Sequence, residues 1–474
     1  MYCNECWYSD NWDQLNSGRA YDPSRPFFEQ FFEVLKATPL FNLYQVRSEN
    51  SEYANSVFDS KNVYLGFSIF ECEGIAYCYN VDWGRDCVDG LNIKKSELLY
   101  ECVDVTDSYG SAFLLRSSKC SSCYACRDCQ DCQDCFGSAN LKHKKFVWLN
   151  QELSEKEYKE KLNQTLASAQ NFKTVLAEAK AHLLNFPVEY ATIRNSEDVT
   201  GDYLLNCTSL DNCFNLQEAE NCADCYRLFN SKDIYRLAYA GYDEKCYQIL
   251  GALHIANCLA VNSGRAGHDQ YYSYFSSDSD DIFGCVSLRK KKFCVLNKQY
   301  SEEDYKKLKA EIVANMKRSG EWGQFFPASI SLQPYNDSLA MDIVPISKEE
   351  ALKGGWTWND NQGGTRGKET IEPENLPGDI ASVGDDFTKE ILRCTTCGVN
   401  YRVNQFELKI LKMLKVPIPE RCVQCRIRDR FMRVNEPKLC EGECKKCKAK
   451  FQTTYAPDRP EIIYCAKCYQ EEVQ

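Results

Sequence analysis

A repeat of twelve residues constrains the fold of this chain more than any other feature. Every twelfth residue from Val63 to Val147, and from Leu210 to Cys294, belongs to one series of 16 positions. At 14 of these positions the residue is apolar or a cysteine. The overall hydrophobic content of 44% would give about seven such residues among 16. Phrases such as KNVY, RDCV and DNCF recur in this rhythm, and each places Asn or Asp before a small apolar residue or a cysteine. Such regular spacing is typical of stacked, equivalent coils.

The repeat predicts a parallel β-solenoid. Asn and Asp tolerate the left-handed backbone conformation that corners require, and the residue that follows can point inward and stack on its equivalent in the next coil. One coil holds either 12 residues, or 24 with two sides, and the sequence does not decide between them. A string of small metal-binding knuckles without a sheet is the competing interpretation.

An internal duplication divides the centre of the chain into two related units. FGSANLKHKKFVWLNQELSEKEYK (136–159) returns as FGCVSLRKKKFCVLNKQYSEEDYK (283–306), with 12 of 24 residues identical. Each copy contains a serine, Ser154 or Ser301, followed three residues later by an acid. This pattern is typical of a helix N-cap. We therefore expect a helix to end each unit, over about 154–185 and about 301–318.

The C-terminal cysteines form two sets with the spacing of structural zinc sites. Two Cys-x-x-Cys pairs supply four thiolates, which a closed tetrahedral Zn²⁺ site requires. The first set predicts a treble-clef-like module whose second pair opens the helix RIRDRFMR, and the second set predicts a zinc ribbon, with Cys440 unassigned. The predicted zinc ligands are Cys394, Cys397, Cys422 and Cys425 in the first set, and Cys444, Cys447, Cys465 and Cys468 in the second.

Cys3 and Cys6 are candidate ligands of a third zinc site. Their context, YCNECW, mirrors YCAKCY at 464–469, so the N-terminus reads like the second half of a zinc ribbon whose first half is missing. Three explanations are open: the native chain begins upstream, the pair takes ligands from elsewhere, or it binds no metal. We favour the first of them.

Six further cysteines follow one another at triplet spacing. They are Cys120, Cys123, Cys126, Cys129, Cys132 and Cys135. The run starts like a bacterial ferredoxin motif but lacks its x-x-x-Cys-Pro continuation. At an offset of 147 the second unit has Gly267, Gln270, Ser273, Ser276, Ser279 and Ile282 in their place. Because cysteine also exchanges with Val, Ile and Leu along the 12-residue series, we predict stacked core residues. A metal or redox cluster and disulfides are the alternatives.

Charge is divided unevenly along the chain. Residues 388–474 carry 18 Lys and Arg against 11 Asp and Glu, whereas the net charge of the whole chain is −11. Arginines at 426, 430 and 433 share one helical face, which predicts contact with nucleic acid, and with RNA rather than DNA because no DNA-reading motif is visible. The predicted contact residues are Arg421, Arg426, Arg428, Arg430, Arg433, Lys445 and Lys446. A solvated basic helix on a structural finger explains the same charge.

Three long phrases resemble a known family. They are CWYSDNWD…GRAYDPSRPFFEQF near the N-terminus, GEWGQFFPASIS at 320–331, and CTTCGVNYRVNQFELKILKMLKVPIPERCVQCR near the C-terminus. The chain is similar, essentially end to end, to a family of uncharacterised Cys-rich proteins from candidate-phyla bacteria. The resemblance implies zinc ribbons that flank a repetitive centre, and it implies no established activity.

The expected fold is mainly β: a duplicated parallel β-solenoid with short α-helices, followed by treble-clef and zinc-ribbon modules. The expected divisions are 1–49 (partial zinc ribbon and helical lead-in), 50–190 and 191–320 (the two solenoid units, each with its helix), 321–387 (extended linker), 388–438 (treble-clef-like zinc module with four cysteines) and 439–474 (zinc ribbon with four cysteines).

The expected function is binding and not catalysis. Only four histidines are present, and the sequence contains no nucleophile–base pair, phosphate loop or dinucleotide fingerprint. The preferred hypothesis is a zinc-binding recognition protein. The alternatives are a protein-interaction scaffold that uses the solenoid faces and an Fe–S or thiol-redox protein that uses Cys120–Cys135, although we do not expect Fe–S. The sequence shows neither a membrane span nor a signal peptide, and reduced or metal-bound thiols fit the cytoplasm.

Overall fold

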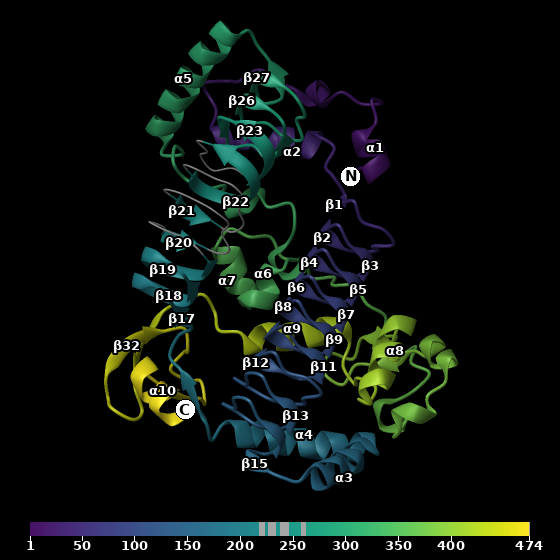
Figure 1. Cartoon of the computed structure of the whole chain (residues 1–474). Coiled ribbons are helices and arrows are strands. Elements are labelled where there is room, and N and C mark those ends of the chain that lie inside the picture. Colours follow the sequence, from purple (N-terminus) through teal and green to yellow (C-terminus); the bar gives the residue numbers. More distant parts are fainter. Residues whose placement is uncertain (218–222, 226–233, 238–245, 257–261, 474) are drawn as a thin grey trace.

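The computed structural model describes residues 1–217, 223–225, 234–237, 246–256 and 262–473, without the side chains of 217–267. Its centre consists of short parallel strands stacked in sheets, with short helices around them (Figure 1). We call residues 45–152 the first strand stack and residues 193–299 the second strand stack. The mainly β character predicted from the repeat is confirmed.

Each strand of the first strand stack pairs in parallel with the strand twelve residues further along the chain. Val57 is registered with Ile69 in one sheet, and Val63 with Ile75 in the other. One repeat therefore contains 12 residues, not 24, and it contributes one strand to each of the two sheets. The interpretation as knuckles without a sheet is wrong.

The bounds of these strands follow the repeat. One sheet contains β1 (Gln45–Val46), β2 (Asn55–Phe58), β4 (Phe67–Phe70), β6 (Tyr79–Asp82), β8 (Leu91–Lys94), β10 (Val103–Thr106) and β12 (Leu115–Ser118). The other contains β3 (Lys61–Tyr64), β5 (Glu73–Ala76), β7 (Arg85–Val88), β9 (Glu97–Tyr100) and β11 (Tyr109–Ala112). The last sheet of this stack contains β13 (Gln133–Phe136), β14 (Lys145–Trp148) and β15 (Gln151–Glu152).

The backbone also has a period of three residues that the 12-residue series does not reveal. From Arg47 to Leu149 every third residue has a positive φ, a conformation that side chains other than Gly, Asn and Asp rarely adopt. Asn62 precedes Val63 in this way and Asp86 precedes Cys87, and the side chains of Val63 and Cys87 are buried. The predicted role of Asn and Asp at left-handed positions is confirmed.

The second strand stack repeats this plan. Its main sheet contains β17 (Ile193–Arg194), β18 (Glu197–Leu205), β19 (Thr208–Gln217), β20 (Ala223–Cys225), β21 (Ile234–Leu237), β22 (Cys246–Ala256), β23 (Asn262–His268) and β25 (Tyr274–Ser277). Its other sheet contains β24 (Gln270–Tyr271), β26 (Asp280–Phe283), β27 (Lys292–Val295) and β28 (Lys298–Gln299).

Members of the predicted 12-residue series form the interior of both stacks. Those whose side chains the structure describes are at most 3% exposed, and they include the two polar members, Ser111 and Gln270. Cys222 and Cys258 lie outside the described residues, and only the backbone is described at Ile234 and Cys246.

Helices end both stacks where the duplication predicts them. Ser154 forms a complete capping box with Glu157 at the start of α3 (Glu155–Leu166), and Ser301 accepts a hydrogen bond from the backbone N–H of Asp304 at the start of α5 (Glu302–Ser319). The helix expected over 154–185 is in fact two helices, because Ser168 caps a second one, α4 (Ala169–Leu183).

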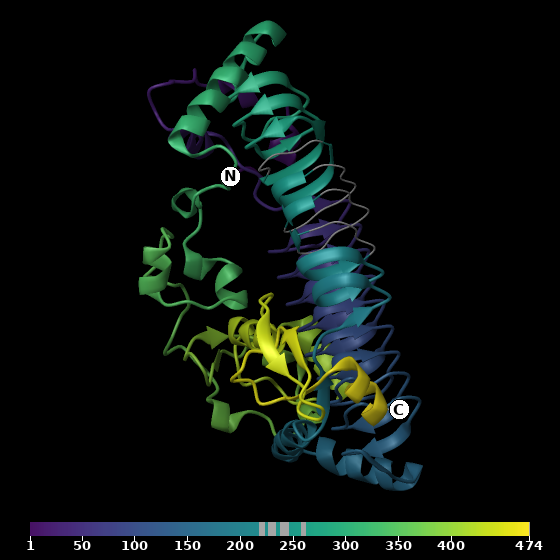
Figure 2. The same ribbon diagram turned by 90° about the vertical axis from the view of Figure 1, so that its left-hand side faces the viewer.

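The two stacks lie side by side and run in opposite directions (Figures 1 and 2). Between them, the hydroxyl of Tyr203 donates to Asp104 Oδ2 at 2.9 Å. Beyond α1 (Asn4–Tyr8), helix α2 (Phe27–Ala37) packs on the end of the second strand stack, with the rings of Phe27 and Phe283 5.1 Å apart. The segment before the first strand stack is therefore fixed to the second.

The chain returns to the first strand stack after residue 320. Residues 321–387, predicted as an extended linker, contain the short helices α6 (Ala340–Ile343) and α7 (Lys348–Lys353). The remaining elements are β29 (Leu392–Arg393), β30 (Asn400–Tyr401), α8 (Gln405–Leu414), α9 (Val423–Arg433), β31 (Cys440–Glu443), β32 (Lys450–Thr453), β33 (Ile462–Tyr464) and α10 (Ala466–Val473). We call residues 388–473 the C-terminal segment. Its strand β33 pairs with β16 (Pro187–Glu189), which lies between the two stacks in the chain.

Candidate metal centres

The first predicted set of zinc ligands is brought together. One pair lies on a tight knuckle between β29 and β30, where the backbone N–H of Cys394 donates to Val399 O at 3.0 Å. The other pair lies at the start of α9, whose N-cap is Cys422. All four Sγ atoms of Cys394, Cys397, Cys422 and Cys425 lie within 4.8 Å of one another.

The second predicted set repeats this construction. Cys444 lies on a knuckle between β31 and β32, where its N–H donates to Ala449 O at 2.9 Å, and Cys465 directly precedes α10. The four Sγ atoms of Cys444, Cys447, Cys465 and Cys468 also lie within 4.8 Å of one another. Each group therefore joins a hairpin to the first turn of a helix.

The distances between sulfurs fit one metal ion in each group. Sγ of Cys397 and Sγ of Cys422 are 3.7 Å apart, as are those of Cys447 and Cys465. Four Zn–S bonds of ~2.3 Å in a tetrahedron separate the sulfurs by ~3.8 Å. The donor set and its spacing therefore suit a tetrahedral, thiolate-binding metal.

Local hydrogen bonds lower the pKa of one thiol in each group. Burial raises the pKa of Cys394, but hydrogen bonds from the backbone of Cys422 and Cys397 outweigh it and lower the pKa to about 6. The pKa of Cys444 is likewise lowered to about 6, against burial, by the backbone of Cys447 and Cys465. Since thiolates bind metals and thiols do not, Cys394 and Cys444 are the thiols in these groups that most readily supply a metal ligand.

Cys3 and Cys6 remain apart from these groups. Both are exposed at the start of α1. Among the residues that the structure describes, only the two C-terminal groups bring three or more potential ligands of this kind together.

The cysteines of the triplet run are core residues. Cys120, Cys123, Cys126, Cys129, Cys132 and Cys135 are at most 2% exposed and belong to one apolar cluster. Each thiol donates to the carbonyl two residues earlier, as Cys126 Sγ does to Tyr124 O at 3.4 Å. The run is not among the groups that could hold a metal ion in the described part of the chain.

The arginines predicted to contact nucleic acid point into the protein instead. Arg426 and Arg430 on α9 are each 1% exposed. Arg426 pairs with Glu407 at 2.7 Å and also with Asp89, and Arg430 pairs with Asp89 at 2.7 Å. The shared helical face predicted for these residues exists, but it is turned toward the first strand stack.

The other predicted contact residues are mostly paired with carboxylates. Arg433 binds Glu101 at 3.0 Å and Arg428 binds Asp342 at 3.0 Å. Arg421 binds Asp429 at 3.2 Å, and Lys446 binds Glu472 at 3.0 Å. Lys445 is exposed. The sequence does not predict these carboxylate partners, because most of them are distant in sequence from the basic residue that they bind and no local pattern marks them.

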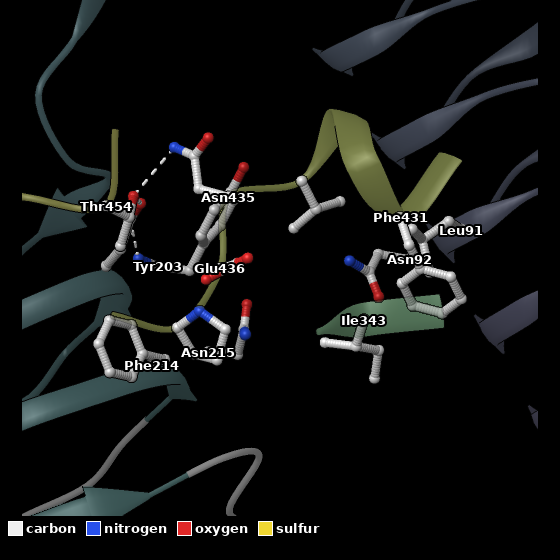
Figure 3. Close-up of a pocket in the computed structure, with 13 residues that line it drawn as sticks. Leu91, Asn92, Tyr203, Phe214, Asn215, Ile343, Phe431, Asn435, Glu436 and Thr454 are labelled. Atoms are coloured by element: carbon white, nitrogen blue, oxygen red, sulfur yellow. Dashed lines mark hydrogen bonds between the residues drawn. The ribbon is translucent and has the colours of Figure 1, made fainter. Parts of the chain in front are cut away.

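A small pocket lies where the C-terminal segment meets both stacks (Figure 3). Leu91 of the first strand stack, Phe214 of the second and Phe431 of α9 line it, and Asn435 donates to Thr454 Oγ1 at 3.0 Å beside it. The lining contains no group of metal ligands among the described residues. The pocket marks the junction of three parts of the chain.

Comparison with known protein families, with curated proteins and with solved structures found no match for this chain. No helix among the described residues combines the length and the apolar character that crossing a membrane requires.

Proposed function

We propose that this protein is a non-enzymatic, zinc-binding scaffold. In this proposal, Zn²⁺ at each four-cysteine group holds the C-terminal segment across two β-solenoid units, and the solenoid faces bind a partner. The observation that carries it is the gathering of four Sγ atoms within 4.8 Å in each of two groups. Four protein thiolates leave no open coordination position for a substrate, which is typical of structural zinc.

The contacts of the C-terminal segment support a fastening role. The first four-cysteine group fixes the start of α9, from which Arg426 and Arg430 reach Asp89 of the first strand stack. The second fixes α10, where the hydroxyl of Tyr469 donates to Asn140 Oδ1 at 3.0 Å. Loss of either metal would release a segment that holds distant parts of the chain together.

The register of twelve residues supports the solenoid interpretation. Solenoids bind partners along extended faces, and large aromatic side chains stand on the surface of the first strand stack. Tyr53, Trp83 and Tyr109 are 68%, 42% and 53% exposed. A protein partner is therefore the preferred ligand class.

Nucleic-acid binding has less support, because the predicted arginines are engaged within the protein. The test is titration of the full chain with single-stranded and structured RNA at about 50 mM salt, where electrostatic binding to phosphates is still strong. Binding that weakens steeply with salt would restore the nucleic-acid hypothesis, and no binding at this salt concentration would remove it.

The zinc proposal is tested by metal analysis and by one substitution. We expect at least about two zinc ions per chain, and we expect Cys394→Ser to lower the free energy of unfolding by more than about 5 kcal/mol, since structural zinc contributes ~10–16 kcal/mol in small zinc peptides. The measurements are elemental analysis and urea unfolding. Cys440→Ser is the matched control, because Cys440 lies next to the second group without belonging to it.

Two results would contradict the proposal. One is purified protein that contains no zinc yet unfolds at the same urea concentration as zinc-loaded protein. The other is stoichiometric iron with sulfide, which would favour the Fe–S alternative.

A further inference from the structure

The N-terminal pair of cysteines is built like the helical half of a four-cysteine site. In both complete groups the first cysteine of the helical pair directly precedes a helix, and its carbonyl accepts from the residue four positions later. The distances are 3.1 Å from Arg426 N to Cys422 O and 2.9 Å from Tyr469 N to Cys465 O. Cys3 directly precedes α1 in the same way, and Trp7 N donates to Cys3 O at 2.8 Å.

The turn that contains Cys3 and Cys6 is packed against the rest of the protein. Trp7 is 4% exposed, and its ring packs 5.1 Å from that of Phe41. The guanidinium of Arg289, on the second strand stack, lies 5.8 Å from the ring of Trp7 and 5.6 Å from that of Trp12. Cation–π contacts of this kind attach the N-terminal turn to the stack.

The backbone before the turn is fixed as well. Tyr2 N donates to Leu40 O at 2.8 Å, and Asn42 N donates to Tyr2 O at 2.9 Å. The two thiols are therefore held in place, yet both are exposed. A buried anchor under an exposed Cys-x-x-Cys pair is what a preformed, outward-facing ligand pair requires.

The other half of this site is absent from the described residues. Each C-terminal group is completed by a hairpin pair, but no third ligand joins Cys3 and Cys6 in the described part of the chain. Tetrahedral structural zinc needs four protein ligands. A second copy of the chain brings the same two thiolates, and a two-fold axis through the metal would place them opposite the first two.

In place of the upstream half-site favoured from the sequence, we propose that Cys3 and Cys6 of two copies of this chain share one Zn²⁺ and so join the copies into a dimer. The step is a ligand exchange: four Zn–S bonds replace all the Zn–water bonds of the hydrated ion, whose waters return to solvent together with four thiol protons. The inference goes beyond the scaffold function and rests on it only for the identity of the metal. The N-terminal ends of the two scaffolds would meet at the shared ion.

The test combines metal content with molecular mass for the full chain in the presence of zinc. We expect a dimer with about 2.5 zinc ions per chain, because two closed sites and half of a shared one add up to that number. The double variant Cys3→Ser, Cys6→Ser is expected to be a monomer with about two zinc ions. Light scattering and elemental analysis measure the two quantities, and Cys440→Ser is the control that should behave like the unaltered chain.

A monomeric unaltered chain would overturn the inference, whatever its zinc content, and so would a double variant that stays dimeric. A monomer with about three zinc ions would show that each chain completes the third site itself, for instance with waters or with further residues of its own. A double variant with fewer than about two zinc ions would instead count against the two four-cysteine sites, so the two proposals fail separately.

Discussion

The two strand stacks share one plan but fill it with different side chains. Where the first strand stack has Cys129, the second has Ser276 at the equivalent position, and both are at most 2% exposed. Each donates to the carbonyl two residues earlier, Cys129 Sγ at 3.4 Å and Ser276 Oγ at 3.5 Å. This interior position therefore accepts a small side chain with one hydrogen-bond donor, and sulfur or oxygen can supply it. The burial of these cysteines among Val, Ile and Leu side chains fits a packing role.

The stacks also differ in how they are covered. The C-terminal segment covers the first strand stack and brings buried charges with it, since Arg426 and Arg430 meet Asp89 there. Helix α2 covers the end of the second with aromatic rings, and Phe27 packs on Tyr272 and Phe283. Both covers bury apolar area, since Leu408 and Leu411 of α8 belong to one hydrophobic cluster with Tyr100 of the first strand stack, but the C-terminal segment adds these buried charge pairs to it. Removing a single partner should therefore be more harmful in the first strand stack.

Among the substitutions that compare the two stacks, the largest effect is expected from Asp89→Asn. The substitution leaves Arg426 and Arg430 buried without this charged partner on the first strand stack, and loss of one partner from a buried ion pair costs about 3–5 kcal/mol. Urea unfolding measures the change. The matched control is Asp59→Asn, because Asp59 also has a positive φ but pairs with Arg47 on the surface. An exposed pair of this kind contributes about 0–1 kcal/mol.

Equal costs for the two substitutions would contradict this picture. Asn tolerates the left-handed conformation as well as Asp does, so backbone strain cannot produce the difference. If Asp89→Asn costs less than about 1 kcal/mol, the buried charges do not hold the C-terminal segment to the stack.

Much of the site could be predicted from the sequence because its information is local. Cys394 and Cys397 are three residues apart, and so are Cys422 and Cys425, so spacing alone indicates four ligands. The 12-residue repeat is equally local, since each strand pairs with the strand twelve residues further along the chain. The triplet period is also visible in Cys120–Cys135, but cysteines at this spacing resemble a metal motif as much as a step between inward positions.

The sequence could not predict that the arginines of α9 point into the protein. Arg426 lies 337 residues from Asp89 along the chain, and no local pattern connects them. The basic balance of the C-terminal segment indicated an exposed surface, yet Arg426 is 1% exposed. Charge counted along a chain does not say whether its partners are water, a ligand or the protein's own carboxylates.

A smaller difference is expected between the two helix caps. Glu157 accepts from both the hydroxyl and the backbone N–H of Ser154, whereas Asp304 accepts only from the hydroxyl of Ser301. We expect Glu157→Ala to cost about 1 kcal/mol and Asp304→Ala about 0.5 kcal/mol, because only Glu157 also accepts from the N-cap backbone N–H. Thermal unfolding of the two variants measures these costs. A larger cost at Asp304 would mean that the helix after the second strand stack, and not its cap, decides the stability there.

The smallest effect is expected from exchanging the two equivalent core residues. Cys129→Ser and Ser276→Cys each keep a small side chain and its donor, so each should change the free energy of unfolding by less than about 1 kcal/mol. Cys129→Leu is the contrasting variant, because overpacking such a core costs about 1–3 kcal/mol. Urea unfolding and elemental analysis of the three variants distinguish a packing role from a metal-binding or redox role.

A metal or redox role for the triplet run predicts a different result: Cys129→Ser would then lose bound metal or redox activity, while Ser276→Cys would change neither. A loss above about 3 kcal/mol for Cys129→Ser would be too large for an isosteric exchange, and it would show that sulfur is needed in the first strand stack for more than its size.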